Sequence, residues 1–350
     1  MKIGLYGLPA AGKTTVLDKI DFMEVLSGSQ LLRVIDPSFD KQDEDGKNAV
    51  RKQLAARLME KQDFIMDGHY AFGSQIAFTE QDGQLYDAFV YLYIDPDILR
   101  NRMLSSEKNQ KYLSFDLREW QLNEIDSLRQ YCHKHFRDFY VVDNPPSFQS
   151  EDCTVLLKFL KHLKDGFSCR RFAEECAGKI LEMSAGEEIV LLDGDKTLIN
   201  EDSSSVVFNY RTRLYDGNFY TGYQSWKQFI EFESYKVPLL REVPVNVNKR
   251  VEDAVTEDTF ILTSGHPRVW KAIAERFNLP AFYGHEMSAE TKLFIVRYLQ
   301  EAGKKVIAYG DGMNDYYMVR QADNGYLVRR LDGSLSRSLK GKDLEGCRYV

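Results

Sequence analysis

The stretch Ile189-Val-Leu-Leu-Asp-Gly-Asp-Lys-Thr-Leu-Ile-Asn200 decides the fold of the second half of the chain. Its four leading apolar residues are typical of a buried parallel strand, which ends in Asp193, Asp195 and Thr197. In an α/β sheet, polar groups at the carboxyl end of a strand lie where ligands bind. Asp and Gly also favour turns, so the pattern taken alone is compatible with a simple turn.

Length and composition indicate a two-domain globular protein rather than a membrane or secreted protein. The chain has 350 residues, more than one hydrophobic core usually supports. No apolar run approaches the roughly 20 residues of a membrane span, and the amino terminus lacks signal-peptide features, which favours a cytoplasmic location. Five cysteines without Cys-x-x-Cys spacing indicate reduced thiols, and a net charge of −7 gives no global footprint for nucleic acid.

A phosphate-binding loop follows the first predicted strand, Lys2–Tyr6. The sequence Gly7-Leu-Pro-Ala-Ala-Gly-Lys-Thr-Thr15 leads from that strand into a helical pattern. Its glycines let the backbone wrap a polyphosphate, Lys13 places a positive charge near the β and γ phosphates, and Thr14 can bind Mg²⁺. We therefore expect ATP to be bound by Gly7, Gly12, Lys13, Thr14 and Thr15.

The loop Gly7-x-Pro-x-x-Gly-Lys-x-Thr15 resembles that of adenylate-kinase-like nucleoside monophosphate kinases, with Ala10 where many members have glycine. The resemblance implies a parallel-sheet kinase domain over about residues 1–165. It also implies that Asp67, at the end of a predicted strand, contacts substrate or a magnesium-bound water, although a helix cap is an alternative.

In these kinases a mobile basic lid follows the third apolar strand, which corresponds here to residues 88–94. Within the matching region, Lys108, Lys111 and Arg118 could neutralise charge on the transferring phosphoryl group, although a solvated helix face explains them equally well.

The residues that would hold the phosphoryl acceptor are less well specified. Residues 31–35 are predicted to form a strand that ends at Asp36, and His69 is as compatible with a structural role as with a ligand contact. A helical stretch after Gly46 carries basic residues that fit a solvated face better than an acceptor pocket: Arg51, Lys52 and Arg57.

Residues 151–183 carry apolar side chains at helical spacing and predict one long helix. We place the domain boundary within it, near residues 166–170. Residues 166–186 would then form a connecting helix, and residues 187–350 the second domain.

Three more segments of the second half deliver polar side chains after apolar runs. The predicted strand starting at Thr259 ends in Ser264 and Gly265, and a later helix carries Lys292. A final strand delivers Asp311 and Asp315. Together with Asp193, these residues predict one site at the carboxyl edge of a sheet.

The order Asp-x-Asp-x-Thr, strand-Ser-Gly, Lys and Gly-Asp-Gly-x-Asn-Asp resembles the haloacid-dehalogenase phosphatase superfamily, most closely its phosphoserine-phosphatase-like branch. The resemblance covers residues 187 to about 335 and implies a Rossmann-like domain with a small cap inserted at about residues 201–258. It implies that Asp193 is the nucleophile that forms an aspartyl-phosphate, and that Asp195 is the general acid and then the base.

The same resemblance assigns the remaining motif residues. Ser264 would bind a phosphoryl oxygen, Lys292 would hold the aspartate and phosphate charge, and Thr197 would brace the loop. Mg²⁺ would be bound by the Asp193 carboxylate, the Asp195 carbonyl and Asp311, with Asp315 as a direct or indirect contact.

The inserted cap is rich in aromatic residues, which favours a cap core over stacking on a base. Arg211 and Arg213 in this insert are compatible with an anionic substrate. His266-Pro267 after the Ser-Gly motif departs from phosphoserine phosphatases, so phosphoserine is not the expected substrate.

The sequence therefore predicts a bifunctional α/β enzyme, with an ATP-dependent kinase followed by a magnesium-dependent phosphomonoesterase that acts on a nucleotide or small phosphorylated metabolite. Two alternatives remain. The combination resembles polynucleotide kinase-phosphatases, which repair nucleic-acid ends, although the acidic composition favours small metabolites. The first half could instead bind nucleotide only to regulate the phosphatase.

Overall fold

The computed structural model describes residues 1–350 apart from 74, 144–151, 209–218 and 234–242. The chain divides into two units, Met1–Phe167 and Ser168–Val350, and each contains a parallel sheet flanked by helices. The predicted α/β fold class is confirmed. Among the described residues, no helix combines the length and apolar composition needed to cross a membrane.

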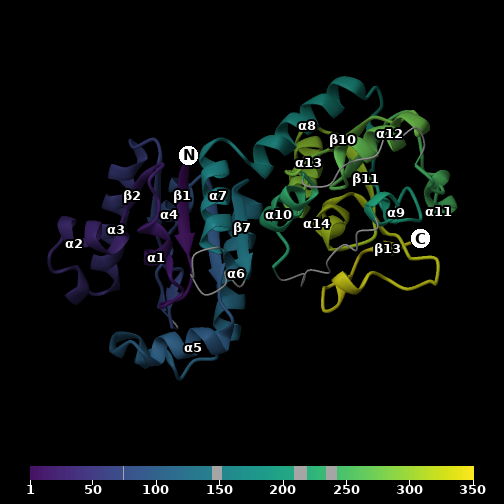
Figure 1. Cartoon of the computed structure of the whole chain (residues 1–350). Coiled ribbons are helices and arrows are strands. Elements are labelled where there is room, and N and C mark those ends of the chain that lie inside the picture. The colour runs from purple at the N-terminus through teal and green to yellow at the C-terminus, as the bar shows by residue number, and fades with distance from the viewer. Residues whose placement is uncertain (74, 144–151, 209–218, 234–242) are drawn as a thin grey trace. The chain divides into compact units, whose positions relative to one another are not determined.

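The first unit is built on five parallel strands in the order β2-β3-β1-β6-β7. In Figure 1, β1 lies between β2 and β7. All six residues of β6 are buried, as expected for a central strand of a parallel sheet that is covered on both faces. The strands are Lys2–Tyr6 (β1), Glu24–Leu26 (β2), Phe64–Asp67 (β3), Ala88–Tyr93 (β6) and Asp138–Asp143 (β7).

A short antiparallel pair, Ala71–Phe72 (β4) and Gln75–Ile76 (β5), lies outside this sheet. The helices of the first unit are Lys13–Leu17 (α1), Gly28–Ile35 (α2), Glu44–Met59 (α3), Glu80–Leu85 (α4), Pro96–Leu104 (α5), Leu117–Lys134 (α6) and Asp152–Lys164 (α7), with 3-10 turns at Phe39–Lys41 (η1) and Glu107–Tyr112 (η2).

The predicted strand at residues 31–35 is wrong, because these residues belong to helix α2. The actual neighbour of β3 is the earlier, shorter strand β2. A short apolar run does not distinguish a strand from a helix by periodicity. Here Val34 is 75% exposed, so the run is not the buried strand that its composition suggested.

The single long helix predicted over residues 151–183 is also wrong. Helix α7 ends at Lys164, and α8 (Cys169–Met183) begins separately. Gly166 adopts a left-handed φ of 111°, which breaks the helix, and the Ser168 side chain caps α8 by accepting a hydrogen bond from Arg171 N. The division between the two units lies at this break.

The second unit contains a six-stranded parallel sheet in the order β10-β9-β8-β11-β12-β13. Helix α13 packs against both α8 and α14. The strands are Glu188–Asp193 (β8), Thr259–Thr263 (β9), Ala281–Tyr283 (β10), Lys305–Gly310 (β11), Asn324–Leu327 (β12) and Arg348–Tyr349 (β13). The helices after α8 are Ser203–Phe208 (α9), Gly222–Glu233 (α10), Lys249–Glu252 (α11), Pro267–Phe277 (α12), Ala289–Glu301 (α13) and Met313–Gln321 (α14), with a 3-10 turn at Arg337–Leu339 (η3).

Trp270 of α12 positions two of the loops that follow these strands. Its side chain is fully buried in the core that also contains Leu192 and Ile261. A Cβ atom at Gly194 would lie 2.3 Å from the Trp270 ring, and one at Gly265 would lie 2.2 Å from it. Both loops therefore need glycine because the indole occupies the space of a side chain.

Glu124 of α6 is a buried polar centre of the first unit, only 2% exposed. Its Oε1 accepts hydrogen bonds from Ala71 N and Trp120 Nε1, both at 3.0 Å, and its Oε2 accepts one from the Tyr91 hydroxyl at 2.8 Å. Burial raises the pKa of Glu124 to about 7, although the Tyr91 hydrogen bond and the charge of Lys13 oppose this shift. The carboxylate thereby ties β4 to α6 and β6.

We expect Gly194→Ala to destabilise the second unit by about 1 to 3 kcal/mol, because the new methyl group displaces the Trp270 ring. The matched control is Gly178→Ala in α8, where a Cβ meets nothing within 4 Å. This control should be neutral or stabilising by about 0.5 to 1 kcal/mol. Urea unfolding checks both values, and a Gly194→Ala variant as stable as Gly178→Ala would contradict the account.

Glu124→Gln should stabilise the first unit increasingly as the pH rises from about 5 to 8. The pKa of Glu124 in the folded protein lies above its ordinary value of 4.5. The wild type therefore loses free energy of unfolding as the pH rises above 4.5 and through about 7, because the buried side chain must become charged. A glutamine can keep the bonds from Ala71 and Trp120, and the Tyr91 hydroxyl can turn to accept from its amide. Urea unfolding at several pH values should show a gain of about 1 to 3 kcal/mol at pH 8. A gain that does not vary with pH would refute this explanation.

Candidate functional site

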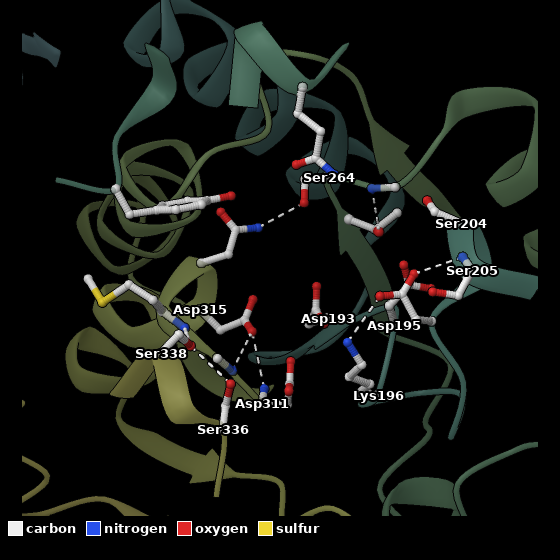
Figure 2. Close-up of a pocket in the computed structure, with 18 of the residues that line it drawn as sticks. Asp193, Asp195, Lys196, Ser204, Ser205, Ser264, Asp311, Asp315, Ser336 and Ser338 are labelled. Atoms are coloured by element: carbon white, nitrogen blue, oxygen red, sulfur yellow. Dashed lines mark hydrogen bonds and ion pairs between the residues drawn. The ribbon is translucent and has the colours of Figure 1, made fainter. Parts of the chain in front are cut away.

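In the second unit, the carboxyl ends of β8, β9 and β11 surround a cavity of about 430 Å³. Figure 2 shows Asp193, Asp195, Ser264, Asp311 and Asp315 around this space. The sequence predicted these residues as one site, and the structure brings them together. Their chemical roles stay predictions.

Lys292 joins two of the carboxylates. Its side chain is fully buried, and its Nζ donates to Asp193 Oδ1 at 2.6 Å and to Asp315 Oδ1 at 2.7 Å. Burial alone would lower the pKa of Lys292, but these two carboxylates raise it above its usual range. The ammonium group is therefore charged and fixed beside Asp193.

Asp315 also organises the start of α14. Its Oδ2 accepts hydrogen bonds from the backbone amides of Asp311 and Gly312, both at 3.1 Å. The close approach of this carboxylate requires glycine at position 310, where a Cβ would lie 2.1 Å from Asp315 Cβ. Asp315 therefore holds the Gly-Asp-Gly turn and Lys292 in one arrangement.

The three carboxylates of Asp193, Asp311 and Asp315 form a group that fits a divalent cation. One oxygen from each lies within 4.8 Å of the others. Burial and neighbouring carboxylates raise the pKa of Asp311 well above its usual range, and burial followed by Asp315 raises that of Asp193. Nearby cations include Lys292, which contacts Asp193 and Asp315, and Arg330, which lies 4.0 Å from Asp311. Hard oxygen ligands such as these carboxylates are those that Mg²⁺ prefers. The Asp195 carboxylate is not part of this group, and the sequence prediction had assigned only its carbonyl to the metal.

The Asp195 carboxylate is held on the other side of the cavity by α9. Its two oxygens accept hydrogen bonds from Ser203 N at 3.0 Å and from Ser203 Oγ at 3.1 Å. Burial, followed by the nearby charge of Asp202, raises the pKa of Asp195 to about 7. This carboxyl group can therefore exist in either protonation state near neutral pH. The predicted brace from Thr197 is not a side-chain bond, because its buried Oγ1 has no partner among the described residues.

Ser264 and His266 follow β9. The Ser264 hydroxyl lines the cavity and accepts a hydrogen bond from Asn314 Nδ2 at 3.1 Å. His266 caps α12 by accepting from Arg268 N at 3.2 Å, which gives a structural reason for the unusual His-Pro pair. The Arg268 amide lies in the first turn of α12. The imidazole nitrogen of His266 accepts from it in place of the side-chain oxygen of a usual N-cap residue.

Several cavity residues of the second unit were not identified from the sequence. Lys196 and Asp202 form an ion pair at 3.1 Å. Among the described aromatic residues of the insert, which the sequence analysis considered for a core or stacking role, Tyr220 lines the cavity. Other insert aromatics, including Trp226 and Tyr223, are buried, in line with a core role. Arg211 and Arg213 lie outside the described residues. Further unpredicted lining residues come from two places. Ser204, Ser205 and Gln228 belong to helices α9 and α10, and Arg330, Ser336 and Ser338 belong to the segment after β12.

In the first unit, the phosphate-binding loop borders a cavity of about 970 Å³. Gly12, Lys13, Thr14 and Thr15 line it. Lys13 Nζ donates to the carbonyl oxygens of Gly7 and Leu8, and burial lowers the pKa of Lys13 to about 8. The hydroxyl-bearing residues Thr14 and Thr15 are exposed, which leaves them accessible to a ligand.

The loop needs unusual backbone angles. Gly7 and Gly12 have φ of 146° and 94°. Ala10 adopts a left-handed φ of 64°, a conformation that glycine adopts more readily than alanine. The loop therefore keeps its shape at the cost of some backbone strain at Ala10.

Asp67 and His69 line the same cavity at the end of β3. Asp67 Oδ1 accepts a hydrogen bond from Gly28 N at 2.9 Å, at the start of α2. Burial, and then the charge of Lys13, lower the pKa of His69 well below its usual value, so its imidazole is neutral. Its ring lies 4.6 Å from that of Phe72.

The predicted basic residues of the first unit separate into two groups. Lys108, Lys111 and Arg51 line the cavity together with Arg102, which the sequence had not singled out for the site. Arg118, Lys52 and Arg57 are exposed and are not among its lining residues. The cavity also contains carboxylates that pair with its cations, as in the Arg33–Asp40 ion pair at 2.8 Å.

Comparisons with known proteins identify the phosphate-loop region most directly. A family described as an AAA domain matches residues 6–114, which lie in the first unit and make up less than half of the chain. Together with the loop geometry, this match makes the first unit a P-loop domain. Among curated proteins, none matches this chain.

Solved structures with some similarity include both kinases and a hydrolase. Shikimate kinase from Acinetobacter baumannii in complex with shikimate is 19% identical, covering 48% of this chain and 95% of that one with a TM-score of 0.33. Shikimate kinase from Aquifex aeolicus is 18% identical, covering 47% of this chain and 99% of that one with a TM-score of 0.29. A HAD family hydrolase from Salmonella enterica serovar Typhi is 15% identical, covering 49% of this chain and 69% of that one with a TM-score of 0.30. At these identities and TM-scores, the similarities carry no argument about what this chain does.

Proposed function

We propose that the chain is a bifunctional enzyme, with a phosphomonoesterase in the second unit and an ATP-dependent kinase in the first. The observation that carries the phosphatase assignment is the buried ammonium group of Lys292 between Asp193 and Asp315. Asp311 is the third member of this cluster of carboxylates. A fixed cation beside a strand-end carboxylate supports a site for a phosphoryl anion.

In the proposed reaction, a carboxylate oxygen of Asp193 attacks the phosphorus atom and the bond to the leaving oxygen breaks. Asp195 in its protonated form gives its proton to that leaving oxygen, which departs as an alcohol. Asp195 then takes a proton from a water molecule, whose oxygen attacks the aspartyl-phosphate. Inorganic phosphate leaves, and Asp193 is regenerated as a carboxylate.

The residues around the cavity support these two roles. The Ser203 hydrogen bonds hold Asp195, and a pKa near 7 suits a group that first donates and then accepts a proton. Lys292 and the Ser264 hydroxyl would bind the phosphoryl oxygens. Mg²⁺, held by Asp193, Asp311 and Asp315 with the Asp195 carbonyl, would supply further neutralisation of the phosphate charge.

For the first unit, the phosphate-binding loop and the cationic lining of its cavity support ATP binding and phosphoryl transfer. Lys13 would bind the β and γ phosphates, Thr14 would hold Mg²⁺, and Asp67 would contact the acceptor or a magnesium-bound water. A cavity that pairs cations with carboxylates suits a polar small-molecule acceptor. The second unit's cavity has the size of a small-molecule site, which favours a nucleotide or small phosphorylated metabolite there.

Asp193→Asn should reduce hydrolysis of p-nitrophenyl phosphate by at least roughly 10³-fold, because the amide is a poor nucleophile. The matched control is Asp253→Asn, since Asp253 is exposed and lies outside the cavity. Steady-state kinetics with Mg²⁺ measure both variants, and thermal unfolding checks that each is folded. Substantial residual activity in Asp193→Asn would exclude the aspartyl-phosphate route.

Lys13→Ala should weaken ATP turnover roughly 100-fold or more, because it removes the charge facing the phosphates. Lys19→Ala is the control, since Lys19 is exposed just beyond α1. ATP binding by calorimetry and phosphoryl transfer to candidate acceptors measure the effect. The wild type could instead bind ATP and transfer no phosphate to any acceptor, while ATP changes the rate of its phosphatase. That result would indicate that the first unit regulates the phosphatase and is not a kinase.

A further inference from the structure

One wall of the second unit's cavity comes from the segment that follows β12. Arg330, Ser336 and Ser338 of this segment line the same cavity as Asp193 and Asp311. In Figure 2, Ser336 and Ser338 lie on the side of Asp311 and Asp315, while Ser204 and Ser205 lie on the other. No step of the proposed phosphoryl transfer uses this wall.

Arg330 lies farther from its carboxylate partner than two other cations near the cavity, Lys292 and Lys196, lie from theirs. Lys292 is bound by two carboxylates, and Lys196 is paired with Asp202 at 3.1 Å. Arg330 forms an ion pair with Asp311, but the distance from Nη2 to Asp311 Oδ2 is 4.0 Å, which is beyond hydrogen-bond distance. The Nη2 atom donates instead to the neutral Ser336 hydroxyl at 3.2 Å, and the buried Nε has no partner among the described residues.

Hydrogen bonds fix the backbone of Arg330, and the contact of Nη2 with the Ser336 hydroxyl places its guanidinium group. Arg330 N donates to Ser334 O at 2.9 Å, and Gly333 N donates back to Arg330 O at 2.8 Å, which closes a tight turn. Gly333 permits the turn through its left-handed φ of 82°. Arg250 Nη1 adds a further bond to Arg330 O at 2.9 Å. Arg330 is therefore held at the cavity wall before any ligand arrives.

A buried, unpaired N–H group on a charged side chain is unfavourable unless a ligand or water satisfies it. A guanidinium group has five N–H donors in a planar fork that matches a carboxylate or a phosphate. Asp311 Oδ2 lies 4.0 Å from Arg330 Nη2, so this carboxylate does not accept a hydrogen bond from the guanidinium group. The Ser336 hydroxyl beside the fork would support the same anion.

We propose that Arg330 binds a second anionic group of the phosphatase substrate. The substrate would then be a small phosphomonoester that carries a carboxylate or a further phosphate in addition to the phosphate attacked by Asp193. The cavity of about 430 Å³ limits the link between the two anions to a small polar skeleton. This inference rests on the proposed phosphatase function and specifies its substrate class.

The experiment compares matched substrates that differ only in the second anion. One pair is 3-phosphoglycerate and glycerol 3-phosphate, which tests a carboxylate. The other pair is glucose 1,6-bisphosphate and glucose 6-phosphate, which tests a phosphate. The full-length wild type, Arg330→Gln, Arg330→Lys and the control Arg337→Gln are assayed with Mg²⁺; Arg337 is exposed and does not line the cavity.

In the wild type, we expect at least one two-anion substrate to have the higher kcat/KM of its pair. Arg330→Gln should reduce the ratio of kcat/KM within that pair by roughly 10 to 100-fold, because a charge-assisted bidentate contact is lost. Arg330→Lys should recover part of the ratio, and Arg337→Gln should not change it. The pair that responds identifies the anion as a carboxylate or a phosphate.

Two results would overturn the inference in different ways. If the wild type prefers neither two-anion substrate, or if Arg330→Gln lowers both members of a pair by the same factor, Arg330 does not recognise a second anion. If hydrolysis of p-nitrophenyl phosphate does not depend on Asp193, the phosphatase function itself fails and this inference fails with it. The p-nitrophenyl phosphate assay thus separates the two failures.

Discussion

The second unit depends on the contact of Lys292 with Asp193 and Asp315. A buried ammonium group is unfavourable unless it is paired, and removing one partner of a buried ion pair typically costs about 3 to 5 kcal/mol. The contact requires β8, α13 and α14 to meet, because Lys292 Nζ of α13 lies 2.6 Å from Asp193 Oδ1 of β8 and 2.7 Å from Asp315 Oδ1 of α14. Helix α13 is placed by its packing against α8 and α14, and Asp315 is placed by two backbone amides of the turn before α14. The same charges that constrain the fold thus create a site for a phosphoryl anion and a cation.

Much of this site could be predicted from the sequence, because parallel strands place their carboxyl ends at one edge of the sheet. Apolar runs that end in Asp193, Ser264 and Asp311 therefore indicate neighbours in space even though they lie far apart in the chain. The phosphate-binding loop is equally predictable, since its glycines and Lys13 must follow one another directly. Lys292 lies within a helix rather than at a strand end, so the strand-end rule does not place it, and its specific role came from the order of motifs in the resemblance.

Other features could not be read from the sequence because they depend on contacts between distant segments. Arg330 lies in a turn after β12 and belongs to no recognisable motif; its unpaired Nε is visible only once the cavity wall is formed. Glu124 reaches Ala71 across 53 positions of sequence. The prediction of a strand at residues 31–35, which belong to helix α2, is wrong because a short apolar run has no distinctive period. The break at Gly166 requires a backbone angle that composition does not reveal. Trp270 explains two glycines that otherwise resemble ordinary turn residues.

The central claim is that Asp193 becomes covalently phosphorylated during turnover. Rapid acid quenching of the wild type with p-nitrophenyl phosphate and Mg²⁺, followed by borohydride reduction, would convert an acyl phosphate into an alcohol. Peptide mass spectrometry should then find homoserine at position 193, and its yield should fall when turnover is complete. Phosphate release without any such conversion, or conversion at another carboxylate such as Asp195, would contradict the account.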